Sequence, residues 1–241
     1  MIIDSESRNN TTVIRHDIAS PFTYPSPFTG ASIIDLGNFK NNGVKANSTY
    51  NSANGGSIVG NSTNSMITVA NSASLEFQSF TYEAWVKPSV LGTNKCLLAT
   101  SSVEGTGKGH PVQFHMSDVN KLRCYFGNST MTALADNSST YVIPNTNIIH
   151  IAVIRDNANK TLEFFFNGVS DGVKSWMEYV GTMTTATFPV GSLDIIIGST
   201  GLASYRIPFA GNMYKWSLTN TILNASDIKN IFNKDKNRFG L

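Results

Sequence analysis

The chain has 241 residues, and only 14% of them are Asp, Glu, Lys or Arg, against about 25% in an average globular protein. Its formal net charge of +2 gives no basic surface for nucleic acid or an anionic membrane, so we expect neither partner. Hydrophobic residues make up 41%, which is enough for a core and argues against general disorder, while 26 Asn residues favour a turn-rich β domain.

The first 32 residues predict an extended arm. Three prolines between residues 20 and 28 exclude a helix there and space out Phe22, Tyr24 and Phe28. Proline preorganises an extended segment and aromatic rings anchor well, so we expect these three rings to bind an adjacent subunit. The alternative is a segment folded back onto its own domain.

Neither a secretory signal nor a membrane span is expected. The N-terminus lacks a basic segment followed by an apolar one, as a signal peptide would have. The longest apolar stretch, Ile148–Ile154, is far short of the roughly 20 residues that cross a bilayer.

Short apolar or alternating runs predict β-strands. Residues 38–71 are dense in Asn, Gly and Ser, which suits tight turns between short strands. Phe80–Lys87, ended by Pro88, is apolar on both faces and therefore predicts a central strand. The other predicted strands are Lys95–Ala99, Val112–Met116, Lys121–Phe126, Ile148–Ile154, Thr161–Phe166, Asp194–Ile197 and Asn212–Leu218.

Near the end of the chain the sequence predicts one helix. Asn224 can cap it, Asp227 follows three residues later as in a capping box, and Ile228, Ile231 and Phe232 fall on one face. Together these elements predict an antiparallel sandwich. The side chains expected inside it are Phe80, Tyr82, Val86, Ile151, Val153, Phe164, Phe166 and Ile196.

Two cysteines, Cys96 and Cys124, lie in apolar runs. One pair in a chain of this length is no disulfide scaffold, so we interpret both as small buried hydrophobic residues and leave a bridge between them open.

Four blocks of the sequence resemble the concanavalin A-like, laminin-G-like jelly-roll superfamily over residues 33–241. Phe80–Pro88 is similar to the family's "FTxEAWVKP" strand. The other three blocks are the entry block Asn51–Val59, the hairpin Ile149–Arg155 with Leu162–Gly168, and the closing block Phe209–Asn212, Leu223–Ile228 and Asn233–Leu241. The entry and closing blocks resemble versions of this domain in structural proteins of tailed, marine phages. The resemblance implies an all-β, two-sheet antiparallel jelly-roll sandwich with a short C-terminal helix, preceded by the arm at residues 1–32.

The superfamily includes glycoside hydrolases, whose chemistry needs two carboxylates about 5 to 10 Å apart. The hydrolase pattern E-x-D-x-x-E is missing here. Glu83 and Glu163 stand singly on predicted strands, and we interpret Glu83 as a hydrogen-bonded strand residue. Trp85 is interpreted as a core residue. We therefore expect no enzyme and no catalytic residues.

Calcium is disfavoured as well, and no other cofactor is expected. Where phage-like relatives carry "FDGTND", this chain has neutral residues at Gly60–Ser65, and neutral oxygens alone bind calcium poorly. The histidines at positions 16, 110, 115 and 150 lack metal-ligand spacing, and His150 is expected to be packed and hydrogen-bonded.

These observations lead to one main hypothesis and two alternatives. The main one is a non-enzymatic structural protein on the surface of a phage particle, as capsid decoration or tail component, made in the host cytoplasm and contacting other virion proteins or a second copy. The alternative is an adhesin that binds a host surface glycan, and a glycoside hydrolase is least favoured. The candidate glycan contacts are Tyr125, Tyr141, Trp176 and Tyr205.

Overall fold

The computed structural model describes residues 12–19, 30–101, 112–127, 134–180, 193–200 and 206–241. Phe22, Tyr24, Phe28 and Tyr205 lie outside these residues. No helix within the described ranges has the length and apolar character needed to cross a membrane.

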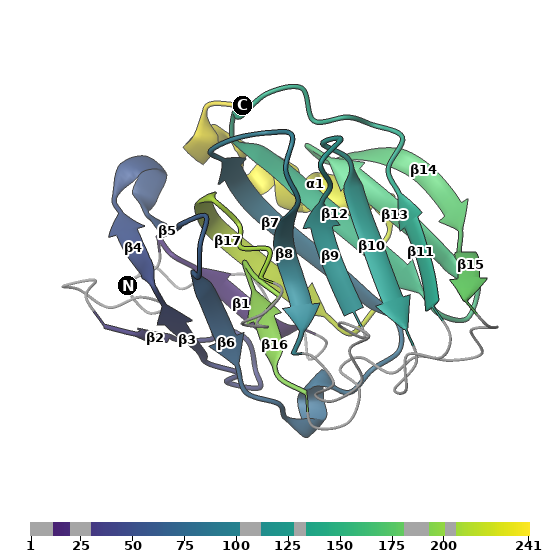
Figure 1. The fold of residues 1–241 in the computed structure, drawn as a ribbon, viewed down its shortest axis with the longest axis horizontal. Helices are drawn as coiled ribbons and strands as arrows, with labels where there is room; N and C mark the ends of the chain where they lie inside the picture. The colour runs from purple at the N-terminus through teal and green to yellow at the C-terminus, as the bar shows by residue number, and fades with distance from the viewer. Residues whose placement is uncertain (1–11, 20–29, 102–111, 128–133, 181–192, 201–205) are drawn as a thin grey trace.

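Two antiparallel sheets pack face to face, as Figure 1 shows. Sheet A has the strand order β14-β13-β12-β7-β17-β5-β4, with β1 paired to β17. Its strands are β1 (Thr12–Asp17), β4 (Ser48–Asn51), β5 (Ser57–Gly60), β7 (Phe80–Pro88), β12 (Ile149–Asp156), β13 (Thr161–Phe166), β14 (Val169–Ser175) and β17 (Gly211–Thr219). This architecture confirms the predicted all-β sandwich.

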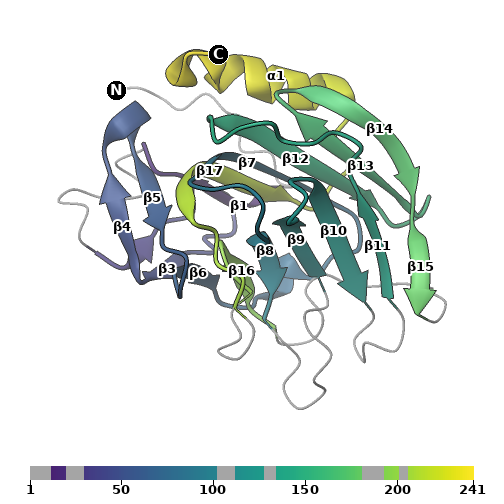
Figure 2. The ribbon, with the colours of Figure 1, turned by 45° about the horizontal axis from the view of Figure 1, so that its top comes forward.

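Sheet B has the order β15-β11-β10-β9-β8-β16-β6-β3-β2. Its strands are β2 (Ser32–Ile33), β3 (Gly43–Ala46), β6 (Met66–Val69), β8 (Lys95–Thr100), β9 (Val112–Met116), β10 (Leu122–Gly127), β11 (Leu134–Ser138), β15 (Met177–Val180) and β16 (Ile195–Ile197). Along one side of the molecule the chain leaves the edge of sheet A as β14 and joins the edge of sheet B as β15 (Figure 2).

The main core lies between the sheets, and β7 is central to it. Alternation puts Phe80, Tyr82, Ala84 and Val86 into this core, while Trp85 points to the outer face of sheet A. All eight side chains that the sequence predicts to be inside are buried. Cys96 and Cys124 are free thiols, and both are buried as expected.

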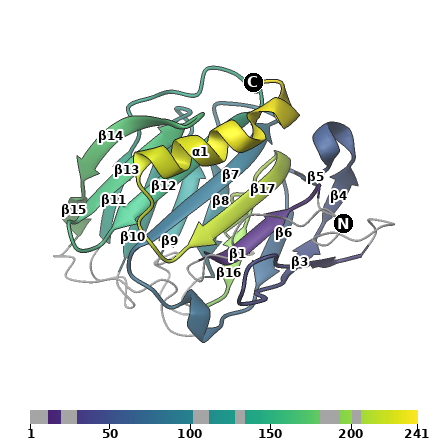
Figure 3. The ribbon, with the colours of Figure 1, turned by 180° about the vertical axis from the view of Figure 1, so that it is seen from behind.

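The C-terminal helix α1 (Ala225–Asp235) lies across the outer face of sheet A, as seen from behind in Figure 3. Asn224 and Asp227 form the predicted capping box. Ile228 packs on β12 and β13, and Phe232 stacks on Trp85 with ring centroids 5.6 Å apart. Three short 3-10 turns complete the described elements: η1 (Ala53–Gly55), η2 (Ala73–Leu75) and η3 (Lys236–Phe239).

The hairpin between β13 and β14 explains how the helix can approach so closely. Asn167 and Gly168 both have positive φ, 50° and 76°, as the predicted tight turn requires. A Cβ atom on Gly168 would lie 2.9 Å from Cβ of Phe232. Glycine at this position therefore serves both the turn and the packing of α1.

The N-terminal segment differs from its prediction. Thr12–Asp17 is strand β1, paired with β17, and Val13 and Ile14 are fully buried. An arm spanning residues 1–32 is therefore wrong for this part of the chain, because the apolar side chains at positions 13 and 14 complete the core instead of extending away from it.

Candidate functional site

A row of polar and aromatic side chains lies on the outer face of sheet B. In β9 and β10 every second residue enters the main core, so the residues between them face outward. The strand register sets Tyr125 opposite Gln113 and Arg123 opposite His115. We call Gln113, His115, Arg123 and Tyr125 the sheet-B row. Figure 1 looks onto this sheet, and α1 lies on the other side of the molecule.

His115 is the most unusual member of the sheet-B row. Its residue is 6% exposed, and its Nδ1 atom has no hydrogen-bond partner. Burial lowers the pKa of His115 to about 4, with a further lowering from Arg123 and an opposing effect of Asp118. The imidazole is therefore neutral at pH 7 and offers one donor and one acceptor.

The candidate glycan contacts do not converge on one site. Tyr125 lies in the sheet-B row and is half-buried, whereas Tyr141 is 42% exposed beyond the end of β11. The ring of Tyr141 rests on Phe166, with the centroids 4.5 Å apart.

Trp176 requires a correction. Its ring is buried between the sheet edges, 4.6 Å from the Phe126 ring, and the Arg155 guanidinium lies 5.1 Å from the indole. The side chain fills the core because β14 crosses to β15 at this residue, and it presents no ring face to a glycan.

The outer face of sheet A carries a different arrangement of charges. Glu83 is buried; its carboxylate accepts a hydrogen bond from Ser217 at 2.9 Å and pairs with Nε2 of His150 at 3.1 Å. This confirms the interpretation of Glu83 and His150 as packed, hydrogen-bonded residues. Among the described residues, no three His, Cys, Asp or Glu side chains are grouped to hold a metal ion.

A groove of about 370 Å³ runs beside α1 on this face, lined among others by Glu83, Lys215 and Asn230. Sequence reasoning missed it, because its walls come from β1, β17, α1 and residues 36–38, which are distant in the chain. The Lys215 ammonium in the groove is 2.7 Å from the Asp235 carboxylate. The Glu83 carboxylate and the Lys215 ammonium in this groove therefore already bond to other residues of the fold.

The segment at Gly60–Ser65 forms a self-contained turn. The Asn61 side-chain oxygen accepts hydrogen bonds from the backbone N–H groups of Thr63, Asn64 and Ser65. A neutral amide oxygen with three N–H donors already around it does not fit a calcium site. Weak or no calcium binding stays a prediction.

Comparisons with solved structures find several domains of similar fold at low sequence identity. The CBM40 of the Ruminococcus gnavus IT-sialidase, bound to α2,3-sialyllactose, aligns with TM-score 0.54 and 12% identity, over 65% of this chain and 83% of that one. Domain 4 of AbnA, a GH43 extracellular arabinanase from Geobacillus stearothermophilus in complex with arabinotriose, aligns with TM-score 0.62 and 14% identity, over 92% and 98%.

The binding domain of botulinum neurotoxin serotype G aligns with TM-score 0.66 and 12% identity over 92% of this chain, which spans 51% of that domain. A search of curated protein sequences found no match. A family model, Laminin_G_3 of the concanavalin A-like lectin/glucanases superfamily, matches residues 61–229. By this match over most of its length, the chain belongs to the concanavalin A-like lectin/glucanases superfamily, in its laminin-G-like branch.

Proposed function

We propose that this chain is a non-catalytic carbohydrate-binding module that uses the outer face of sheet B. The observation that carries the proposal is the register of the sheet-B row, which sets the aromatic ring of Tyr125 beside Gln113 and next to Arg123 and His115. A sugar presents apolar C–H faces and a ring of hydroxyl groups. The half-buried Tyr125 ring and Arg123 guanidinium match both kinds of surface, and the buried Gln113 and His115 side chains lie beside them.

Two further observations support this proposal. The domains of similar fold from Ruminococcus gnavus and Geobacillus stearothermophilus were solved with bound oligosaccharides. The buried Glu83 carboxylate is held by Ser217 and His150, which leaves it in a structural role and supports a module without hydrolase activity.

The proposal is tested with a glycan array that spans neutral and acidic oligosaccharides, followed by titration calorimetry with the strongest binder. α2,3-Sialyllactose and arabinotriose serve as fixed comparison probes. Tyr125→Ala is expected to weaken binding at least about tenfold, equivalent to about 1.4 kcal/mol. Phe39→Ala is the matched control, because Phe39 is an aromatic residue that is 42% exposed on the loop between β2 and β3, at the opposite edge of sheet B from β10. Absence of binding across the array, or equal losses in both variants, would reject the proposal.

The role on a phage particle stays a prediction. It rests on the resemblance of the first and last sequence blocks to domains of phage structural proteins, and it is compatible with glycan binding. Mass spectrometry of purified particles tests it directly: the chain should be present in stoichiometric amounts, and its absence from particles would contradict a virion location.

A further inference from the structure

Tyr141 is held in place unusually well for an exposed aromatic residue. The residue is 42% exposed, and its ring rests on that of Phe166, with the centroids 4.5 Å apart and an interplanar angle of 41°. No described residue makes a hydrogen bond to its hydroxyl group. The adjacent Val142 and the cross-strand partner of Phe166, Val169, are 46% and 67% exposed. We call Tyr141 with Phe166 beneath it the edge platform.

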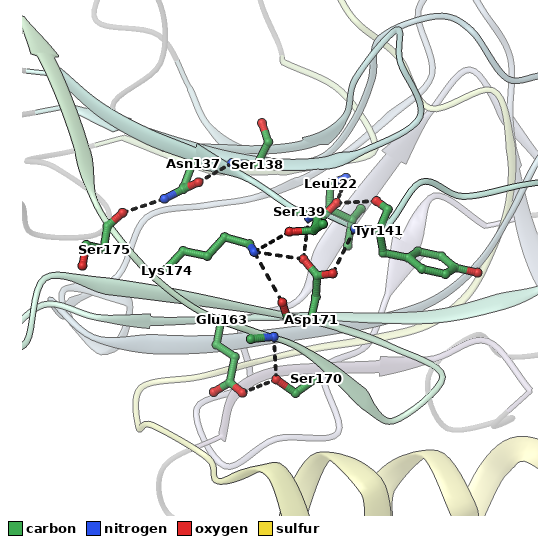
Figure 4. Close-up of polar contacts among 12 residues, drawn as sticks. Leu122, Asn137, Ser138, Ser139, Tyr141, Glu163, Ser170, Asp171, Lys174 and Ser175 are labelled. Atoms are coloured by element: carbon green, nitrogen blue, oxygen red, sulfur yellow. Dashed lines mark hydrogen bonds and ion pairs between the residues drawn. The ribbon is translucent and has the colours of Figure 1, made fainter.

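Side chains from both sheets fix the backbone under this ring, as Figure 4 shows. The Asp171 carboxylate, on edge strand β14, accepts hydrogen bonds from the N–H groups of Thr140 and Tyr141, the latter at 2.9 Å. The Ser139 hydroxyl donates to the Tyr141 carbonyl at 2.8 Å. Both backbone groups of Tyr141 are therefore bonded while its ring faces solvent.

Lys174 completes the arrangement around the carboxylate. Its ammonium is 3.3 Å from Asp171 and donates to the Thr140 hydroxyl at 2.9 Å, so the turn, the carboxylate and the cation form one unit. We call Asp171 and Lys174 the clip. The clip joins the edge strand of sheet A to the loop that follows β11 of sheet B.

A tyrosine that served only the stability of the fold would contribute most with its ring buried. A surface tyrosine without a role would not need hydrogen bonds to both of its backbone groups. An exposed ring that is already ordered loses little conformational entropy when a ligand stacks on it. The apolar face of a pyranose ring fits a flat aromatic surface of this kind, and the hydroxyl of Tyr141, to which no described residue bonds, can bond to a sugar hydroxyl.

We propose that the edge platform is a second saccharide contact, separate from the sheet-B row, and that Asp171 is its positioning residue. The inference rests on the proposed function, since it assigns a further subsite to the same carbohydrate-binding module. Asp171 does not touch the sugar; it acts by holding the Thr140–Tyr141 turn so that the ring lies on Phe166.

The test is a double-mutant cycle measured by titration calorimetry with the array's strongest oligosaccharide. Tyr141→Ala is expected to weaken binding about tenfold, and Asp171→Asn about threefold, because an amide accepts fewer backbone bonds and loses the ion pair with Lys174. In the double variant, the loss of binding affinity should equal the loss in Tyr141→Ala alone. Tyr141→Phe should retain most of the affinity, since stacking remains.

Asn137→Ala is the matched control. It removes another bond between the same sheet edges, from Asn137 to the Ser175 carbonyl at 2.6 Å, without touching the Thr140–Tyr141 turn. It should lower the melting temperature as much as Asp171→Asn does but leave the dissociation constant unchanged. Thermal melts of every variant separate this structural effect from the effect on binding.

The outcomes distinguish the two proposals. If Tyr125→Ala weakens binding while Tyr141→Ala does not, the edge platform is rejected and the proposed function stands. If the losses of Asp171→Asn and Tyr141→Ala add in the double variant, Asp171 does not act through Tyr141 and its positioning role is overturned. If the wild type binds no saccharide on the array, both proposals fall.

Discussion

Glu83 shows how one buried residue can be charged and join neighbouring strands. Burial by itself would raise the pKa of its carboxyl group, but the hydrogen bond from His150, the Lys215 ammonium and the Ser217 hydroxyl outweigh burial and lower that pKa below the usual value. The carboxylate is therefore ionised at pH 7 and ties β7 to β12 and β17, the two strands on either side of it.

Glu83→Ala should destabilise the protein by about 3 kcal/mol, because it leaves the buried polar groups of His150 and Ser217 without a partner. Glu163→Ala is the matched control: Glu163 lies on β13, two strands away from β7, is half-buried, and among the described residues its carboxylate bonds to Ser170 of the edge strand. It should cost less than about 1 kcal/mol. Urea unfolding measures both free energies, and equal values for the two variants would contradict the structural role given to Glu83.

At the scale of elements, two residues at the C-terminal end, Arg238 and Phe239, fasten strands of sheet A together on its outer face. We call them the C-terminal latch. Phe239 stacks on Trp85 with centroids 4.3 Å apart, and the Arg238 guanidinium bonds to Asp17 of β1 at 2.9 Å. The last residues of the chain thus hold the first described strand and the central strand together.

Phe239→Ala should lower the free energy of unfolding by about 3 kcal/mol and shift tryptophan emission to longer wavelength, because water reaches the Trp85 indole. Leu241→Ala, two residues on and 46% exposed, should change neither quantity. An unchanged emission maximum in the Phe239 variant would show that Trp85 is covered by something other than the latch.

Strand β1 gives the second prediction at this scale. Ile14 is fully buried and Ile34 is 38% exposed, so the two isoleucines form a matched pair. Ile14→Ala should cost about 3 kcal/mol and Ile34→Ala less than about 1 kcal/mol, as measured by urea unfolding. A small cost at Ile14 would mean that β1 detaches in solution and that the segment is an arm after all.

The elements differ in how far their sequences specified them. Phe80–Pro88 is apolar on both faces, and a strand of this kind is buried on both sides, so its central position could be predicted from the sequence. The capping box at Asn224 fixed the start of α1 in the same way. Strand β14, VSDGVKS, was missed because an edge strand with exposed side chains and a Gly172 bulge carries no apolar periodicity.

The candidate site could be predicted only in part. Tyr125 and Tyr141 were candidates because they are aromatic, and Trp176 was a candidate for the same reason. Residue type could not separate them, because tertiary packing decides which ring is exposed. Asp171 gave no signal at all, since its partners Thr140 and Tyr141 come from the opposite sheet edge, about thirty residues away in the chain.

For the whole molecule, the proposed binding surface and the packing of the C-terminal helix lie on different sheets. The sheet-B row lies on the outer face of sheet B, while α1 and the C-terminal latch cover the outer face of sheet A. Substitutions in the latch are therefore expected to change stability without changing sugar affinity, as long as the sandwich remains folded.

The pH dependence of stability is a property of the whole molecule, because two buried histidines in different sheets contribute to it. Burial lowers the pKa of His16 in β1 to about 3 and that of His115 in β9 to about 4, from an ordinary value of 6.5. Below pH 6.5 the unfolded chain therefore binds protons that the folded chain does not, so their contribution to stability is complete above pH 6.5 and is lost as the pH falls.

Between pH 6.5 and 5.5 each histidine should lower the free energy of unfolding by about 1 kcal/mol, and the loss should continue towards pH 4. Urea unfolding at pH 7.5, 6.5, 5.5 and 4.5 measures this slope. His115→Gln removes one of the two groups and should roughly halve the slope between pH 6.5 and 4.5. A stability that stays constant over this range would mean that both imidazoles take up protons at their ordinary pKa in the folded protein, which would contradict the lowered pKa of His16 and of His115 in the sheet-B row.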